Sequence, residues 1–279
     1  MYLEPIFQSD ADVIRLYHEY CSENELKAAS RNVFMDEIKS NNFSTFKPWK
    51  DQCDDCTQHA EGNLSEEQYV IHIRDKDSAR AQMEAEIQTA KDSGGSIKVI
   101  TMDLQCVLLC PSLKVSALYY RTKLCVHNFT IFGCVSADVK CFVWHEAEGG
   151  LSANEFASCL YSYLTEDKDF DKCIVWSDGC TYQNRNVTLS KALTYFAQQN
   201  GKVIEQKILT KGHTQMKVDS VHSHIKTAIG QRPIYCPADY LRIMEKARKN
   251  PKPYDVKYLD HTFFGFFHYV HSQIHQTRK

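Results

Sequence analysis

The chain has 279 residues, of which 43% are hydrophobic and 24% are charged, so it can bury one large or two small cores and is not disordered. The formal net charge of −2 excludes a global basic field, and the lack of any apolar run of roughly 20 residues excludes a membrane span and a membrane partner. Twelve cysteines without a signal-peptide pattern at the start predict an intracellular, reduced protein with its thiols in the core or on metal.

Residues 1–95 are predicted to be a helical region. Residues 9–42 contain two short amphipathic patterns, with Val13, Leu16, Tyr17 and Tyr20 on one apolar face and Val33, Phe34 and Ile38 on the next. The pair could be a helix-turn-helix, although two packed helices with no role in DNA binding are favoured because the turn lacks a glycine. A long charged helix follows over residues 65–93, and Gly94 and Gly95 end it. This pattern places a domain boundary at 95/96.

A Cys-x-x-Cys pair precedes the long helix. Cys53 and Cys56 have the spacing that lets two thiolates reach one Zn²⁺, but a single pair is only half a site. The second half could come from four residues: His18, Cys21, His59 and His72. The alternative is a turn with two free thiols.

Residues 96–279 have the pattern of an α/β domain. Three strands are predicted over 97–109, 123–134 and 140–148, then a helix over 151–166, a strand over 172–178, a helix over 186–201, a strand over 202–210 and a helix over 211–229. Hairpin-connected strands followed by crossover units predict a mixed five-stranded sheet with helices on its faces.

Four carboxylates are expected to converge at one edge of this sheet. Asp103 lies late in the first strand, Glu155 in the first turn of the first helix, Asp178 at the end of the fourth strand and Asp219 near the start of the last helix. Carboxylates in one pocket repel one another, so the arrangement favours divalent cations that neutralise them. His222, three residues after Asp219, is expected on the solvated side of its helix and is a second candidate for the pocket.

The order of these elements resembles the ribonuclease-H-like superfamily. "ANEFASCL" is similar to its glutamate-bearing helix, "IVWSDGC" to its second aspartate strand, and "KGHTQMKVDS" to its Gly-His followed by the last aspartate. From about Tyr17 to about Pro237 the chain is also similar to transposon-encoded proteins of the DDE/D transposase type, which carry "KDQC", a Cys-x-x-Cys pair and a Gln-Asn-x-Asn segment. Gly179 stands where that group has asparagine.

The resemblance implies metal-dependent phosphodiester cleavage and strand transfer on DNA, with two Mg²⁺ or Mn²⁺ ions. Asp103 and Asp178 would bridge the ions, and Glu155 and Asp219 would complete the coordination. His213 would move protons at the leaving oxygen, because an imidazole titrates near neutral pH.

The resemblance also implies that Cys21 and His72 complete the zinc site of Cys53 and Cys56, and that the protein is nuclear or cytoplasmic. Basic stretches at 121–123, 183–186 and 242–257 offer contacts to DNA phosphates. Two alternatives stay open. One is a nuclease that uses only water, on an RNA–DNA hybrid or structured DNA, and the other is a catalytically silent module that binds nucleic acid or protein. Assembly into a homo-oligomer also stays open.

Overall fold

The structure is a computed structural model that describes residues 10–41, 43, 52–118 and 120–265. Its contacts divide the chain into two compact units, Met1–Gln52 and Cys53–Lys279. For residues 258–279 the sequence predicts a strand or a helix packed on the core. The structure has the short 3-10 helix η2 (His261–Gly265) there, and residues 266–279 lie outside the described part.

The first unit contains the two predicted helices, α1 (Asp10–Glu23) and α2 (Arg31–Ser40). The rings of Tyr17 and Phe34 stack at 4.3 Å between centroids and hold the helices together. Ser30 caps α2 by accepting a hydrogen bond from the Val33 amide. Residues 24–30 connect the helices, and this connection is longer than the three or four residues of a helix-turn-helix, so the packed pair is the better description.

The second unit is built on a mixed sheet of seven strands in the order β6-β5-β1-β3-β4-β7, with β2 paired to β3. The strands are β1 (Ile97–Leu104), β2 (Leu108–Cys110), β3 (Leu124–Gly133), β4 (Val139–His145), β5 (Lys172–Ser177), β6 (Val203–Ile208) and β7 (Asp255–Tyr258). The five predicted strands are all present. The first predicted strand, 97–109, is divided into β1 and β2, and the sequence missed β7 because its four residues are too few for a period-two pattern.

The strand order defines a ribonuclease-H-like fold. β1, β3 and β4 form an antiparallel meander, and β5 and β6 lie parallel to β1 on its other side. The helices of the crossovers are α5 (Ala153–Glu166), between β4 and β5, and α6 (Val187–Asn200), between β5 and β6. After β6 the chain continues into α7 (Lys217–Ile229) and α8 (Pro237–Ala247), and a 3-10 turn, η1 (Ser116–Leu118), follows β2. The predicted α/β class and superfamily fold are confirmed.

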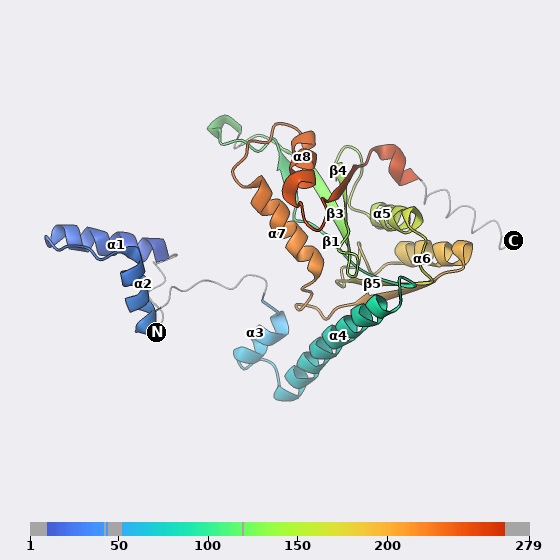
Figure 1. The fold of residues 1–279 in the computed structure, drawn as a ribbon, viewed down its shortest axis with the longest axis horizontal. Coiled ribbons are helices and arrows are strands. Elements are labelled where there is room, and N and C mark those ends of the chain that lie inside the picture. The colour runs from blue at the N-terminus through green and yellow to red at the C-terminus, as the bar shows by residue number, and fades with distance from the viewer. Residues whose placement is uncertain (1–9, 42, 44–51, 119, 266–279) are drawn as a thin grey trace. The chain divides into compact units, whose positions relative to one another are not determined.

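Helices cover both faces of the sheet (Figure 1). α5 and α6 pack on one face over a core that contains Phe129, Trp144 and Phe156, all at most 1% exposed. α7 and α8 cover the other face around Val221 and Met244. Within the described ranges, none of the helices combines the length and the apolar character that crossing a membrane requires.

The long helix α4 (Glu66–Asp92) belongs to the sheet unit, as does the short helix α3 (Asp54–Ala60) before it. Ala90 of α4 is buried against Val99 and Ile174. The Trp176 indole donates a hydrogen bond of 2.9 Å to Glu86, which also pairs with Lys207. The structure therefore divides the chain at Gln52/Cys53 and not at the predicted 95/96, because α4 packs directly on the sheet.

Candidate active site

Asp103 and Asp178 lie on neighbouring parallel strands. The register of β1 and β5 pairs Thr101 with Trp176, Asp103 lies two residues further along β1, and Asp178 directly follows the last residue of β5, Ser177. Since side chains alternate along a strand, both aspartates face the same side of the sheet as Thr101 and Trp176, which is the side that α4 covers. The charge of Asp178 contributes to the raised pKa of Asp103, although Asp178 is not among the described side chains whose ligand atoms lie within 4.8 Å of one another around Asp103.

α7 brings two more polar side chains to Asp103. Carboxylate oxygens of Asp103 and Asp219 and a ring nitrogen of His222 lie within 4.8 Å of one another. The Nδ1 atom of His222 is 3.8 Å from Oδ2 of Asp103. Val218 and Val221 are buried against the sheet, and Asp219 and His222 each follow one of them, so they lie at the edge of the buried face of α7.

The electrostatics of this pocket disfavour charge on its carboxylates. Burial raises the pKa of Asp103 to about 7, with further contributions from the nearby charges of Asp178 and Asp219. Burial and the charge of Asp178 also raise the pKa of Asp219, although the Met216 amide donates a 2.7 Å hydrogen bond to its carboxylate and opposes the shift. Such a pocket holds either protons or cations.

His222 lies inside the pocket rather than on the solvated side of its helix. Its side chain is only 13% exposed, and burial lowers its pKa to about 4, which keeps the imidazole neutral at neutral pH. The buried Nε2 atom has no hydrogen-bond partner among the described residues. The prediction that His222 lies on the solvated side of its helix is wrong, because the buried face of α7 is wider than the apolar positions in the sequence indicate.

Residues after β5 hold the Asp178 carboxylate in place by hydrogen bonds. Asn184 donates a 2.5 Å hydrogen bond and the Cys180 amide a 3.2 Å hydrogen bond to Oδ1 of Asp178. The Asn184 side chain is fully buried, and its backbone carbonyl accepts a hydrogen bond from Gln206 on β6. Sequence reasoning missed this role of Asn184, since no local pattern shows which strand will cover it.

The predicted phosphate contacts of residues 183–186 need correction. Gln183 and Asn184 are buried, and Asn186 caps α6 by accepting a 2.8 Å hydrogen bond from the Leu189 amide. Arg185 alone in this segment is exposed. In the stretch 242–257, Arg248 packs its guanidinium 4.7 Å from the Tyr254 ring and donates to the Ala137 carbonyl, so it stabilises the fold.

Glu155 occupies a capping position. Its Oε2 atom accepts a 2.9 Å hydrogen bond from the Ser152 amide and another from the Ser152 hydroxyl, and the Ser152 hydroxyl in turn caps the first turn of α5. The structure does not place Glu155 in the group of Asp103, Asp219 and His222. This difference from the predicted four-carboxylate pocket has a local cause, because the helix needs the carboxylate for its own N-terminus.

We therefore expect Glu155→Ala to reduce the free energy of unfolding by about 1 kcal/mol, the usual effect of losing a cap. The stabilisation of the protein by Mn²⁺ should stay unchanged. Chemical denaturation with and without Mn²⁺ measures both quantities. Loss of the Mn²⁺ effect in this variant would restore Glu155 as a metal ligand.

A second group of side chains gathers around the Cys-x-x-Cys pair. Nε2 of His72 lies 3.2 Å from Sγ of Cys53 and 3.6 Å from Sγ of Cys56. Nε2 of His213 lies 3.3 Å from Sγ of Cys56 and 3.1 Å from Nε2 of His72. All four ligand atoms lie within 4.8 Å of one another.

The structure places several of the candidate ligands differently from the prediction. His213 lies with the two cysteines and not with the carboxylates, because the loop after β6 passes over α3. Cys21 lies buried in α1, which belongs to the other unit. His59 stacks on Tyr69 at 3.7 Å and pairs with Glu66, and His18 lies beside Tyr17 on α1. Of the two expected partners in the second unit, His72 lies with the Cys-x-x-Cys pair and His59 does not.

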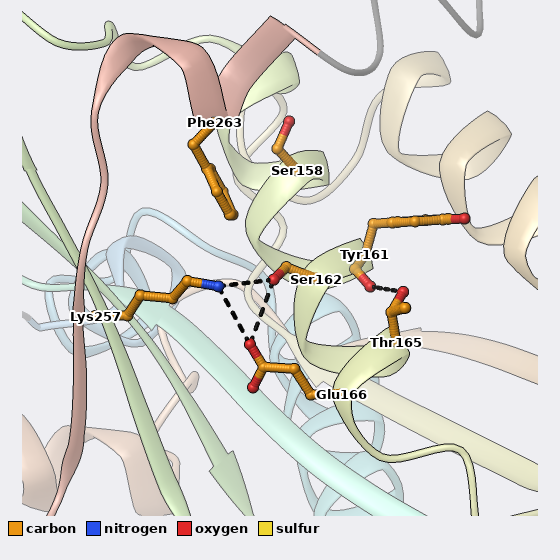
Figure 2. Close-up of a pocket in the computed structure, with 7 residues that line it drawn as sticks. All are labelled: Ser158, Tyr161, Ser162, Thr165, Glu166, Lys257 and Phe263. Carbon is orange, nitrogen blue, oxygen red and sulfur yellow. Dashed lines mark hydrogen bonds and ion pairs between the residues drawn. The ribbon is translucent and has the colours of Figure 1, made fainter.

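A pocket of about 330 Å³ lies apart from both groups, beside α5 (Figure 2). Tyr161, Ser162 and Glu166 of α5 line it together with Lys257 and Phe263. Lys257 donates a hydrogen bond to Ser162 and forms an ion pair with Glu166 at 3.3 Å, so these two charged groups of the pocket neutralise one another. It contains none of the predicted site residues, and we place the chemistry at the carboxylates instead.

Comparisons with known proteins give limited information. No family model matches the chain, and no curated protein matches it. Two solved structures of the human cytomegalovirus terminase nuclease domain are similar to it, one soaked with Mn and one soaked with Mn and bound to an inhibitor. The first has 11% identity and a TM-score of 0.25 over 65% of this chain and 73% of that one. The second has 14% identity and a TM-score of 0.26 over 70% and 85%. Because these TM-scores are low, the fold assignment rests on the strand order alone.

Proposed function

We propose that this protein cleaves phosphodiester bonds of nucleic acid with divalent cations held by Asp103, Asp178 and Asp219. The observation that carries the proposal is the group of Asp103, Asp219 and His222, whose ligand atoms lie within 4.8 Å of one another and in which burial and the neighbouring carboxylates raise the pKa of the half-buried Asp103 to about 7. Proteins seldom bury such a repulsive group unless a cation binds there.

The donor set fits Mg²⁺ or Mn²⁺. Carboxylate oxygens are the ligands that both ions prefer, and a neutral imidazole suits Mn²⁺ as well. Asp103 and Asp178, on adjacent strands, would hold the cations from one side, and Asp219 and His222 of α7 would hold them from the other. Bound cations of this kind stabilise the charge on the attacking and leaving oxygens of an in-line displacement.

The chain's own residues keep this arrangement rigid. Asn184 and the Cys180 amide fix the orientation of the Asp178 carboxylate through its Oδ1 atom. The Met216 amide fixes Asp219 in the same way. The proton-transfer role predicted for His213 is withdrawn, because that residue lies in the Cys-His group.

Strand transfer on DNA is the reaction we favour within this class, on the basis of the transposase-like motif order. Cleavage by water alone, on DNA or an RNA–DNA hybrid, uses the same carboxylates with a different nucleophile. Strand transfer is distinguished from cleavage by water through its product, a covalent joint between the cleaved strand and a second DNA molecule.

The test is a cleavage assay on labelled duplex DNA and on an RNA–DNA hybrid, with Mn²⁺, with Mg²⁺ and without either ion. We expect cleavage only with a divalent cation, and a roughly hundredfold lower rate for Asp178→Asn, which corresponds to about 2.7 kcal/mol of lost transition-state stabilisation. Asp169→Asn changes an exposed aspartate that precedes β5, at the opposite end of this strand from Asp178, and serves as the matched control. Cleavage that survives in Asp178→Asn, or that needs no cation, would contradict the proposal.

A further inference from the structure

We propose that Cys53, Cys56, His72 and His213 bind one Zn²⁺ ion in a closed tetrahedral site. A tetrahedral zinc ion with Zn–S bonds of about 2.3 Å and Zn–N bonds of about 2.0 Å places its ligand atoms about 3.3–3.8 Å apart. Four of the six distances between ligand atoms in this group run from 3.1 to 3.6 Å, and all six are below 4.8 Å. The side chains therefore already have the geometry that the ion requires.

The chemistry of the donors selects zinc over the ions of the carboxylate pocket. Two thiolates and two imidazoles are a common ligand set of structural zinc, whereas Mg²⁺ and Mn²⁺ prefer oxygen. Neither Cys53 nor Cys56 forms a disulfide, so both sulfur atoms are available. With four protein ligands the site has no open position, and a structural role follows.

Neighbouring residues orient the ligands. Nδ1 of His72 lies 3.3 Å from the Asp55 carboxylate, which directs the Nε2 atom toward the sulfur atoms. A carboxylate behind a ligating histidine fixes its tautomer and raises its basicity. Gly212, next to His213, packs so closely on Cys53 that a Cβ atom there would lie 2.6 Å from Sγ. The chain is thus built to bring residue 213 to the Cys-x-x-Cys pair.

The ion would join two segments that are far apart in the sequence. Cys53 and Cys56 lie at the start of α3 and His72 lies in α4, whereas His213 lies in the loop between β6 and α7. His213 is three residues before Met216, whose amide holds the Asp219 carboxylate. Zinc would therefore fix the loop that enters α7, and, insofar as the proposed function holds, would position Asp219 without touching the substrate.

The first measurement is the zinc content of the full chain purified without chelators, by mass spectrometry. We expect one zinc ion per chain. Cobalt replacing zinc should show the d–d absorption of a tetrahedral site and thiolate-to-cobalt charge-transfer bands. These readouts need no nucleic acid, so they stay informative if the cleavage assay fails. Zinc below about one-tenth of an equivalent would overturn the proposal, since a closed site retains its metal.

The second measurement identifies the fourth ligand. His213→Gln keeps a polar side chain but should weaken zinc binding by roughly a hundredfold or more in competition with a chromophoric chelator, because ligand loss costs at least as much as loss of a supporting residue. His213→Cys should restore binding with a stronger charge-transfer band, which a merely structural histidine would not do.

The matched controls are Cys21→Ala and His59→Ala, which change two of the three other side chains that the sequence offers. Both should bind zinc as the wild type does. If His213→Gln binds zinc as tightly as these controls, or if Cys21→Ala loses the metal, the assignment of His213 is wrong.

Discussion

Without Mg²⁺ or Mn²⁺, the wild-type protein should become less stable than Asp103→Asn as the pH rises from 4 to 7. Asp103 has a folded-state pKa of about 7 against an ordinary value of 3.8, so the folded state keeps a proton that the unfolded chain has already released. Stability falls with pH wherever the folded state binds more protons. At about 1.36 kcal/mol per pKa unit, the difference between the two proteins should change by about 4 kcal/mol across this range and stay constant above it.

The measurement is urea denaturation of both proteins at several pH values between 4 and 8, first without added divalent cation and then with Mn²⁺. Comparing the two proteins at each pH removes the contribution of all other titrating groups. Saturating Mn²⁺ should stabilise the wild type by about 2.7 kcal/mol at a hundredfold excess over Kd and should have little effect on Asp103→Asn. A stability difference that does not vary with pH would show that Asp103 titrates in its ordinary range.

Gly212→Ala should destabilise the protein and remove its zinc. Gly212 has a φ of +77°, and an added Cβ would lie 2.6 Å from Sγ and 2.9 Å from the backbone Cα of Cys53. The left-handed backbone costs about 1–2 kcal/mol with a side chain present, and overpacking costs about 1–3 kcal/mol more. We therefore expect about 2–5 kcal/mol lower stability, measured by chemical denaturation, together with a loss of bound zinc.

Gly62→Ala separates the cost of the left-handed backbone from the cost of the close contact with Cys53. Gly62 also has a φ of +77°, but no atom lies within 4 Å of the position that its Cβ would occupy. This variant should therefore show only the cost of the backbone conformation, about 1–2 kcal/mol, and should keep its zinc. Equal effects of the two substitutions would mean that the contact between Gly212 and Cys53 is not part of a tightly packed metal site.

Local patterns in the sequence were sufficient for the core of the fold. The apolar strands over 97–104 and 172–177 and the glycine-ended helix before Gly201 predict crossover units from short-range periodicity alone. The sequence predicts Asp103 and Asp178 to be partners because each lies near the end of a strand of this kind, and parallel strands bring their carboxyl ends to one edge. The short strand β7 carries no such periodicity.

The capping role of Glu155 could also be predicted from the local sequence. Ser152 and Glu155 have the three-residue spacing of a capping box, which uses the carboxylate at the start of its own helix. The prediction of Glu155 as a fourth pocket carboxylate gave more weight to its position at the start of a helix beside the sheet edge than to that pattern.

Only the tertiary structure decided the places of His213 and His222. Residue 213 is 157 positions from Cys56, and no short-range pattern can show that the loop after β6 passes over α3. The burial of His222 depends on the rotation of α7 about its own axis where it packs on the sheet. This rotation is set by tertiary packing, and helical periodicity does not predict it. The sequence alone determined which elements form and which strand ends carry carboxylates, because those follow from contacts between near neighbours. The pairing of ligands across distant segments follows from long-range packing.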